Sequence, residues 1–198
     1  MNKKIIKPTP FGSVCVVWHV SNNFPLIVSV LLSRPGSSAE DRALLLFPDS
    51  RKSSCAEIDK IEVSIKAYLA GEKVKFSLNL VDLSQCTKFQ QLVLRAQHAI
   101  PRGLVSTYGL VAAHVGVPDG ARAVGNALAG NPFPLIVHCH RTILSNLSLG
   151  GFQSGTEMKR ALLEKEGIIL CTALYKVFQS FSFKLCFIEL INGGVCSK

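Results

Sequence analysis

Acidic residues and long apolar runs are both scarce in this sequence of 198 residues. Hydrophobic residues make up 48% of the chain, enough apolar surface to offset the entropy lost on folding, so a disordered protein is excluded. No stretch reaches the ~18 unbroken apolar residues that a membrane-spanning helix needs. Lysines near the N-terminus are followed by prolines instead of an apolar segment, so no secretory signal is expected. We therefore expect a globular cytoplasmic protein, nuclear if the source is a eukaryote, with no membrane partner.

Paired cysteines and phosphate-binding loops are missing as well. The seven cysteines are odd in number and include no C-x-x-C pair, which argues against a disulfide framework and a zinc ribbon. Cys15 and His19 have too few clustered partners for a metal site. No glycine-rich loop that could cradle a nucleotide phosphate appears. We therefore expect neither a metal nor a cofactor.

Carboxylates are nearly absent from the middle of the chain. Four arginines between residues 91 and 155 stand against one acid, Asp119. The whole chain has 22 lysines and arginines and 13 acidic residues, a formal net charge of +9. Groups that would repel phosphate are therefore rare in this stretch, which favours a polyanionic partner.

Residues 1–85 are predicted to form a small domain in which strands precede a helix. A length of 198 residues suits one large domain or two small ones. A helix is expected from Ser53 or Ser54 to Leu69, with isoleucines on one face and Gly71 after its end. β-Branched and apolar runs predict strands at residues 13–20, 26–32, 42–47 and 74–80.

Helical patterns replace the strands in a second predicted domain, residues 86–167. Apolar spacing and turn residues predict three helices there. Their expected spans are 88–100, from a cap at Ser106 or Thr107 to Val115, and from Pro118 to Asn131. The short turn between the second and third helices makes them a candidate helix-turn-helix. The predicted fold class is therefore α+β, a small sheet-plus-helix domain followed by a mainly helical one.

Small residues dominate the helix expected after Pro118. Ala121, Ala123 and Gly125 leave Arg122 as its charged side chain. This low profile suits close approach to a narrow groove, with one arginine able to reach inside, whereas a major-groove reader usually projects several polar side chains. A tightly packed core helix is the alternative interpretation.

Cys139 is the candidate nucleophile of the chain. It stands between His138 and His140, before Arg141 and after a proline-stiffened apolar run. An electropositive setting favours the thiolate, and an unperturbed thiol is only about 3% ionised at pH 7. Because neighbouring side chains diverge, these residues are not expected to hold one zinc ion together.

Several short motifs follow one another in a characteristic order between residues 85 and 167. They are Ile100-Pro-Arg-Gly, Ser106-Thr-Tyr-Gly109, Ala121-Arg-Ala-Val-Gly125, Asn131-Pro132, Cys139-His-Arg141, Gly150-Gly-Phe152 and the segment 159–167. In residues and spacing the chain resembles the O6-alkylguanine-DNA alkyltransferases, also called methylated-DNA–protein-cysteine methyltransferases. Residues 68–80 resemble the end of that family's N-terminal domain. The resemblance implies a ribonuclease H-like fold for residues 1–85.

The resemblance also implies an activity, the repair of alkylated DNA. Such a protein rotates O6-alkylguanine out of the duplex and transfers the alkyl group irreversibly to Cys139, one event per molecule. The implied roles are proton acceptance through a water for His140 and orientation of that histidine for Glu166. Asn131 would brace the turn before the active-site segment, and Tyr108 would donate its hydroxyl to guanine N3.

The implied partner is double-stranded DNA that carries O6-alkylguanine, with O4-alkylthymine as a further candidate. Binding from the minor groove is implied, with Arg122 entering the gap in the base stack, and we expect a monomer. The residues implied to lie against the DNA are Ala121, Arg122, Ala123, Gly125 and Tyr108. Those implied to line the substrate pocket are Thr142, Phe152, Gln153 and Lys159.

The chain departs from the family pattern at several positions. His138 stands where the family usually has proline, which gives the thiol a second neighbouring imidazole. Thr142 replaces the usual valine, and its hydroxyl is expected to face the alkyl pocket. The resemblance does not cover the tail, residues 168–198, where alternating apolar residues at 181–187 predict a half-buried strand.

Two other hypotheses remain open from the sequence. One is a non-catalytic lesion-binding protein of the alkyltransferase-like kind, although such proteins lack the cysteine at position 139. The other is a cysteine hydrolase that uses Cys139 and a histidine, although the chain has no separate histidine motif for it. Only the hydrolase would turn over.

Overall fold

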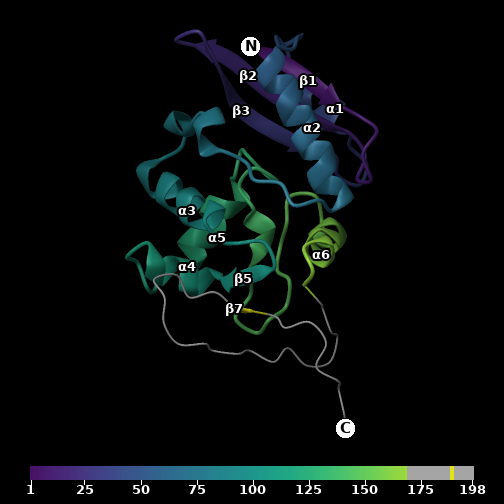
Figure 1. The fold of residues 1–198 in the computed structure, drawn as a ribbon. Coiled ribbons are helices and arrows are strands. Elements are labelled where there is room, and N and C mark those ends of the chain that lie inside the picture. Colours follow the sequence, from purple (N-terminus) through teal and green to yellow (C-terminus); the bar gives the residue numbers. More distant parts are fainter. Residues whose placement is uncertain (169–187, 190–198) are drawn as a thin grey trace.

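The computed structural model describes residues 1–168 and 188–189, and its two lobes are drawn in Figure 1. One lobe contains the N-terminal sheet and the other contains most of the helices, so the expected α+β class is confirmed. The strand predicted at 181–187 lies outside the described residues. Within the described residues, no helix is both long enough and apolar enough to cross a membrane.

The N-terminal sheet has four strands in the order β3-β2-β1-β4. β2 pairs antiparallel with both β1 and β3, whereas β4 pairs parallel with β1. Asn22 and Asn23 connect β2 to β3 with φ angles of 48° and 61°, the left-handed conformation of a tight hairpin turn. The strands expected at 13–20 and 26–32 are thus confirmed. The bounds are β1 (Asn2–Ile6), β2 (Val14–Ser21), β3 (Phe24–Leu32) and β4 (Arg51–Lys52).

Two of the predicted strands are wrong. Residues 42–47 mostly belong to a helix, α1 (Ala39–Leu46), because Ser38 and Asp41 form a capping box that starts it. Residues 74–80 form no strand and end in a 3-10 turn, η1 (Leu78–Leu80), capped by the Ser77 side chain. Strand-like pairing with the sheet follows only at Val81, which forms a bridge with Ile27. β1 was not expected, because its lysines interrupt the apolar pattern.

α2 (Ala56–Ala70) confirms the helix expected across residues 53–69 and covers the sheet (Figure 1). Its N-cap is Cys55 instead of the expected serines. Gly71 ends the helix as expected, with a φ of 104° that side chains rarely adopt. The isoleucines of its inner face are buried, and Tyr68 in the last turn is buried with them.

The second lobe confirms the three predicted helices. Thr107 caps α4, as the sequence predicts, and Thr87 caps α3. The third helix starts three residues after Pro118 because residues 118–120 form a turn. α4 packs on α5 and α3, and a small sheet has the order β6-β5-β7. The bounds are η2 (Leu83–Gln85), α3 (Lys88–His98), β5 (Leu104–Thr107), α4 (Tyr108–His114), α5 (Ala121–Ala129), η3 (Cys139–Arg141), β6 (Thr142–Ile143), α6 (Thr156–Lys165) and β7 (Ile188–Glu189).

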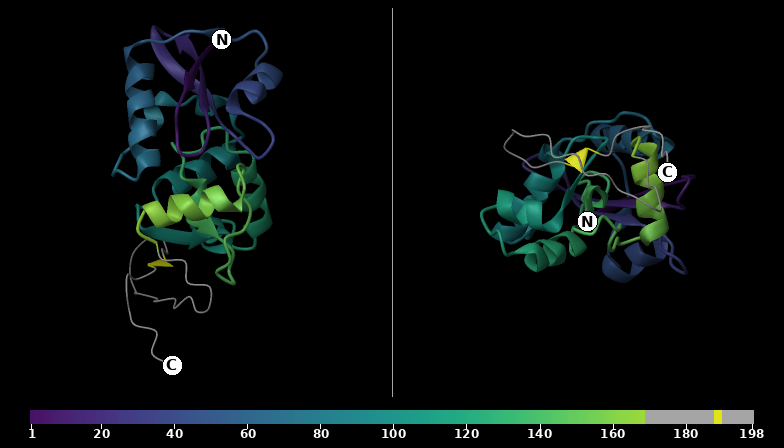
Figure 2. Two further views of the ribbon diagram at one scale, coloured as in Figure 1. Left: turned by 90° about the vertical axis from the view of Figure 1, so that its right-hand side faces the viewer. Right: turned by 90° about the horizontal axis from the view of Figure 1, so that it is seen from below.

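The lobes share one apolar core, which extends from β1 to α6. The C-terminal end of α2 approaches α6 (Figure 1). α6 is the yellow-green helix that crosses the front of the helical lobe in the left view of Figure 2. Arg102 connects these two ends. Its guanidinium donates to the carbonyl oxygens of Gly71 (2.7 Å), Glu72 (3.0 Å) and Lys165. One side chain therefore fixes the end of α2 to the end of α6.

Replacing Arg102 with alanine tests this connection. Because three carbonyl groups lose a charged donor, we expect the free energy of unfolding to fall by about 1–3 kcal/mol. Arg95→Ala is the matched control, an exposed arginine of α3 whose loss is expected to change stability by less than about 0.5 kcal/mol. Urea unfolding measures both. Equal stability of the two variants would contradict the connecting role.

Candidate active site

The segment between α5 and β6 carries Cys139 and is held by Asn131. Asn131 is buried, and its side-chain oxygen accepts from the Phe133 N–H at 2.9 Å while its amide donates to the Val137 carbonyl at 3.2 Å. The apolar run from Phe133 to Val137 is buried, and Leu135 within it has a φ of 72°. The turn is therefore anchored both by side-chain hydrogen bonds and by packing, and it delivers Cys139 to the start of η3.

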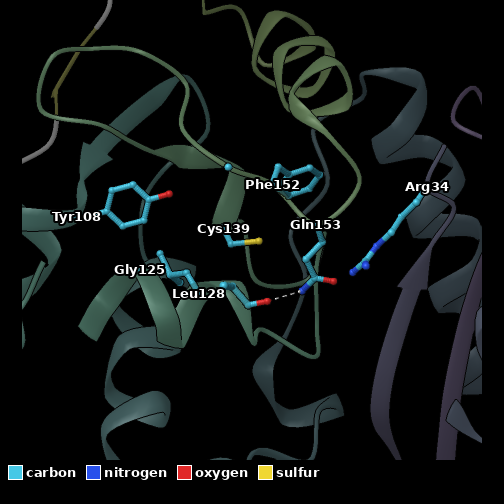
Figure 3. A pocket seen from close by; sticks show the side chains of 9 residues that line it. Arg34, Tyr108, Gly125, Leu128, Cys139, Phe152 and Gln153 are labelled. Carbon is cyan, nitrogen blue, oxygen red and sulfur yellow. Dashed lines mark hydrogen bonds between the residues drawn. The ribbon is translucent and has the colours of Figure 1, made fainter. Parts of the chain in front are cut away.

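Cys139 lies in a pocket of about 440 Å³, and the close view in Figure 3 shows its thiol among the lining side chains. Residues from α4, α5 and the loop before α6 surround the sulfur. Gln153 is fixed there, because its amide donates to the Asn131 carbonyl at 2.6 Å. The lining residues are Arg34, Tyr108, Gly125, Leu128, Ala129, Cys139, Gly151, Phe152 and Gln153.

The surroundings of the Cys139 thiol shift its pKa in opposite directions. Burial raises the pKa of Cys139, while a hydrogen bond with Asn131 and the positive charge of Lys159 lower it. Lys159 is fully buried behind the pocket, and burial lowers its own pKa to about 8. Its ammonium group donates to the carbonyl oxygens of Thr142 (2.6 Å) and Gly151 (3.3 Å). Because the net shift favours the thiol, a nucleophilic Cys139 needs a nearby proton acceptor.

His140 and Glu166 form a buried pair next to Cys139. The His140 Nε2 atom is 3.0 Å from Glu166 Oε1, and Arg141 binds the same carboxylate with two donors at 2.8 Å. Burial would raise the pKa of Glu166, but the hydrogen bonds from His140 and Arg141 lower it far more. Burial lowers the pKa of His140, and Glu166 opposes that shift. Glu166 is therefore ionised at neutral pH, and the neutral His140 is available to accept a proton.

The helix of small residues, α5, exposes the face that the sequence predicts to be flat. Arg122 and Ala123 are exposed on α5, whereas Val124 and Leu128 on its other side are buried. Gly125 lies between the two faces, and a Cβ atom there would meet the Tyr108 ring at 3.8 Å. Tyr108 therefore lies next to α5 at Gly125, and a Cβ atom at this position would make only an ordinary van der Waals contact with the ring.

Two residues expected in the substrate pocket do not line it. Thr142 and Lys159 are fully buried, behind the pocket wall. The expectation that the Thr142 hydroxyl faces the alkyl pocket is wrong, because this hydroxyl donates to the side-chain oxygen of Gln97 at 2.5 Å. Phe152 and Gln153, the other two expected residues, do line the pocket.

His138 packs between the lobes and does not line the pocket. Its ring stacks on His98, with centroids 5.6 Å apart and planes 21° apart, and lies 5.8 Å from the Tyr68 ring. Within the described residues, neither ring nitrogen has a hydrogen-bond partner. Burial lowers the pKa of His138 well below the usual value, and the charge of Arg141 adds to the shift. The second imidazole is therefore neutral and contributes packing at this interface.

Comparisons with known proteins identify the family. The model of the DNA-binding domain of 6-O-methylguanine DNA methyltransferase matches residues 88–168. A crystal structure of the Mycobacterium tuberculosis O6-methylguanine methyltransferase is 32% identical, with a TM-score of 0.68, and the match covers 83% of this chain and 92% of that chain. The chain belongs to the O6-methylguanine-DNA methyltransferase family. The structure of the enzyme from the archaeon Pyrococcus kodakaraensis is 23% identical and shares the fold, with a TM-score of 0.65.

Curated relatives match this chain in sequence over part of their length. The methylated-DNA–protein-cysteine methyltransferase of Methanothermobacter thermautotrophicus is 43% identical over 113 residues, which is 57% of this chain and 63% of that protein. The protein of the same name from Mycobacterium tuberculosis is 46% identical over 102 residues, 52% of this chain and 61% of that protein. The matches therefore span about three fifths of these methyltransferases.

Sequence analysis did not name as site residues three that line the pocket, Leu128, Ala129 and Gly151. It also missed two residues of the site that lie outside the segment 88–168 matched by the methyltransferase model. Arg34 reaches the pocket from the turn after β3, and nothing in its local sequence marks it. Tyr68 contacts the buried pair from α2, and its place in a motif shared with the methyltransferases was the available signal. Both contacts depend on how the lobes meet, which local patterns do not encode.

The neutral His138 predicts how stability depends on pH. Its folded-state pKa is lowered, whereas in the unfolded chain it takes up a proton near pH 6.5. Because neutral His138 is favoured in the folded state, its contribution to the free energy of unfolding is fully present above pH 6.5. That contribution is lost as the pH falls below 6.5, by up to about 1.4 kcal/mol per pH unit. We expect His138→Leu to lose less stability than the original chain between pH 6.5 and 5.5, as measured by urea unfolding. Parallel pH profiles would contradict a lowered pKa of His138 in the folded state.

Proposed function

We propose that this protein repairs DNA by transferring an alkyl group from O6 of guanine to Cys139, one event per molecule. The observation that carries the proposal is a thiol in a pocket of about 440 Å³ with a buried imidazole–carboxylate pair beside it. Relatives at 43% and 46% identity are named methylated-DNA–protein-cysteine methyltransferases. A related Mycobacterium tuberculosis structure, 32% identical with a TM-score of 0.68, contains DNA.

Recognition is proposed to take place from the minor groove. The exposed face of α5 is flat, so the backbone can approach the narrow groove, and Arg122 extends from it toward the gap left by the rotated nucleotide. Tyr108 at the edge of the pocket, with a pKa that burial raises, keeps its phenolic proton for donation to guanine N3. Arg34 adds positive charge at the pocket. The absence of acidic residues other than Asp119 between 91 and 155 limits repulsion of the phosphates.

The proposed reaction is a single displacement at the alkyl carbon. His140 Nδ1 takes the proton of the Cys139 thiol through a bridging water, and Glu166 stabilises the imidazolium that forms. The sulfur then forms a bond to the alkyl carbon as the bond from that carbon to O6 breaks. The electron pair passes to the guanine, which Tyr108 stabilises by its donation to N3 and which regains one proton.

The product is a thioether, which explains why no turnover is expected. A thioether sulfur has no easy hydrolytic exit, unlike the thioester of a cysteine hydrolase. All the proposed roles are filled by one chain, which supports action as a monomer. The proposal places the protein with its DNA, in the cytoplasm or in the nucleus of a eukaryote, and extends from O6-alkylguanine to O4-alkylthymine as a second substrate.

Incubation with a duplex oligonucleotide that contains O6-methylguanine tests the proposal. We expect peptide mass mapping to find one added methyl group on the peptide that contains Cys139, with a yield that does not exceed one per protein. Cys139→Ser is expected to keep lesion binding and to abolish transfer, because it removes the sulfur nucleophile and little volume. More than one event per molecule would indicate a hydrolase, and binding without methylation would indicate a lesion-binding protein.

Arg122 tests the proposed rotation of the nucleotide. We expect Arg122→Ala to lower the transfer rate from duplex DNA by about 10–100-fold, since an inserted side chain offsets about 1–3 kcal/mol of unstacking. The rate with free O6-methylguanine base is expected to stay within about twofold of the original. Arg160→Ala on α6 is the control that removes the same charge at another place on the chain. Equal losses with the duplex and the free base would contradict the role in rotation.

A further inference from the structure

Tyr68 is the residue of the N-terminal lobe that contacts the buried pair beside Cys139. It lies in the last turn of α2 and is 2% exposed. Its hydroxyl oxygen is 2.9 Å from His140 Nε2, and the hydroxyl also donates to Glu166 Oε1. We propose that Tyr68 is a positioning residue that fixes His140 with Nε2 protonated, so that Nδ1 is left as the proton acceptor for Cys139. This inference rests on the proposed alkyl transfer.

The hydrogens available to these three groups support only one arrangement. The ionised Glu166 can only accept, and the Tyr68 phenol has one hydrogen to donate. The phenol hydrogen is directed to Glu166, so the Tyr68 oxygen can only accept from His140. A hydrogen on His140 Nε2 satisfies both the contact of 2.9 Å with Tyr68 and that of 3.0 Å with Glu166. An unprotonated Nε2 would instead face the carboxylate with its lone pair, a repulsive contact.

The opposite nitrogen of His140 is left without a partner. Nδ1 is buried and has no hydrogen bond within the described residues. In a neutral imidazole protonated at Nε2, Nδ1 carries the lone pair that accepts a proton. Tyr68 thus acts through His140 and does not need to touch the substrate.

The position of Tyr68 is fixed by the meeting of the two lobes. Its ring packs edge-on against Phe76, with centroids 5.6 Å apart, and next to the His138 ring. Arg102 holds the residues that follow α2 against the end of α6, which directly precedes Glu166. The orientation of the proton acceptor therefore depends on the N-terminal lobe, which supplies none of the site residues predicted from the sequence.

Tyr68→Phe in the full chain tests the inference, because it removes one oxygen and keeps the ring. With duplex O6-methylguanine DNA under single-turnover conditions, we expect the saturating transfer rate to fall about tenfold, the effect of one lost hydrogen bond to a charged group. The DNA concentration at half-saturation is expected to change less than twofold, since Tyr68 does not touch DNA. The acid limb of the rate profile is expected to move to higher pH, because Glu166 without its phenol donor attracts the imidazole proton more strongly.

Phe76→Leu is the matched control for packing. It removes the aromatic contact of Tyr68 but leaves the hydroxyl, so we expect lower thermal stability with a transfer rate within twofold of the original chain. An unchanged rate or an unmoved acid limb in Tyr68→Phe overturns the inference. A loss of rate in Phe76→Leu that equals the loss in Tyr68→Phe also overturns it, because packing would then explain both.

A measurement without DNA separates this inference from the proposed function. In protein labelled with ¹⁵N at histidine, the resonances of His140 are assigned by comparison with His140→Gln. We expect Nε2 of the original chain to be protonated at neutral pH and Nδ1 to be unprotonated. A proton on Nδ1 overturns the inference even if transfer occurs. Absence of methyl transfer by the original chain would instead overturn the proposed function.

Discussion

The carboxylate of Glu166 is the group on which the rest of the site depends. It is buried and receives hydrogen bonds from Tyr68 of α2 and from His140 and Arg141 of η3. A buried charge is tolerated only when paired and hydrogen-bonded, so the position of each partner is constrained by the others. These hydrogen bonds lie at the contact between the two lobes, so the geometry around Cys139 depends on how the lobes pack.

A second buried charge balances the other side of the cysteine. The ammonium group of Lys159 donates to the carbonyl oxygens of Thr142, which follows η3, and Gly151, which lines the pocket. Neutral carbonyl groups only partly compensate a buried cation, and this explains why its pKa falls to about 8. The cation lowers the pKa of Cys139, while His140, paired with Glu166, is the proposed proton acceptor. Burial of the thiol, which by itself opposes ionisation, is thus offset from two directions.

The sequence was sufficient where chemistry depends on local order along the chain. Cys139, His140 and the brace Asn131 stand within ten residues, and the cap Thr107 acts on its own helix, so patterns locate them. Sequence patterns fail where contacts between distant segments determine the secondary structure or the site. The lysines of β1 hide a strand that exists because β2 and β4 flank it, and a capping box turns an apolar run into α1. Arg34 and Tyr68 act across the boundary between the lobes, and of the two only Tyr68 lies in a segment that the resemblance covers.

The same dependence on tertiary contacts explains how a histidine can occupy the position before Cys139. A proline there would restrict the backbone by itself. In this chain the restriction comes from elsewhere, because the Gln97 amide donates to the carbonyl of His138 at 2.7 Å and the ring is stacked on His98. The cost is a pair of buried ring nitrogens without partners in the described residues. The segment that presents the thiol is therefore held by its neighbours, and its rigidity is a property of the packed lobes more than of the residues that compose it.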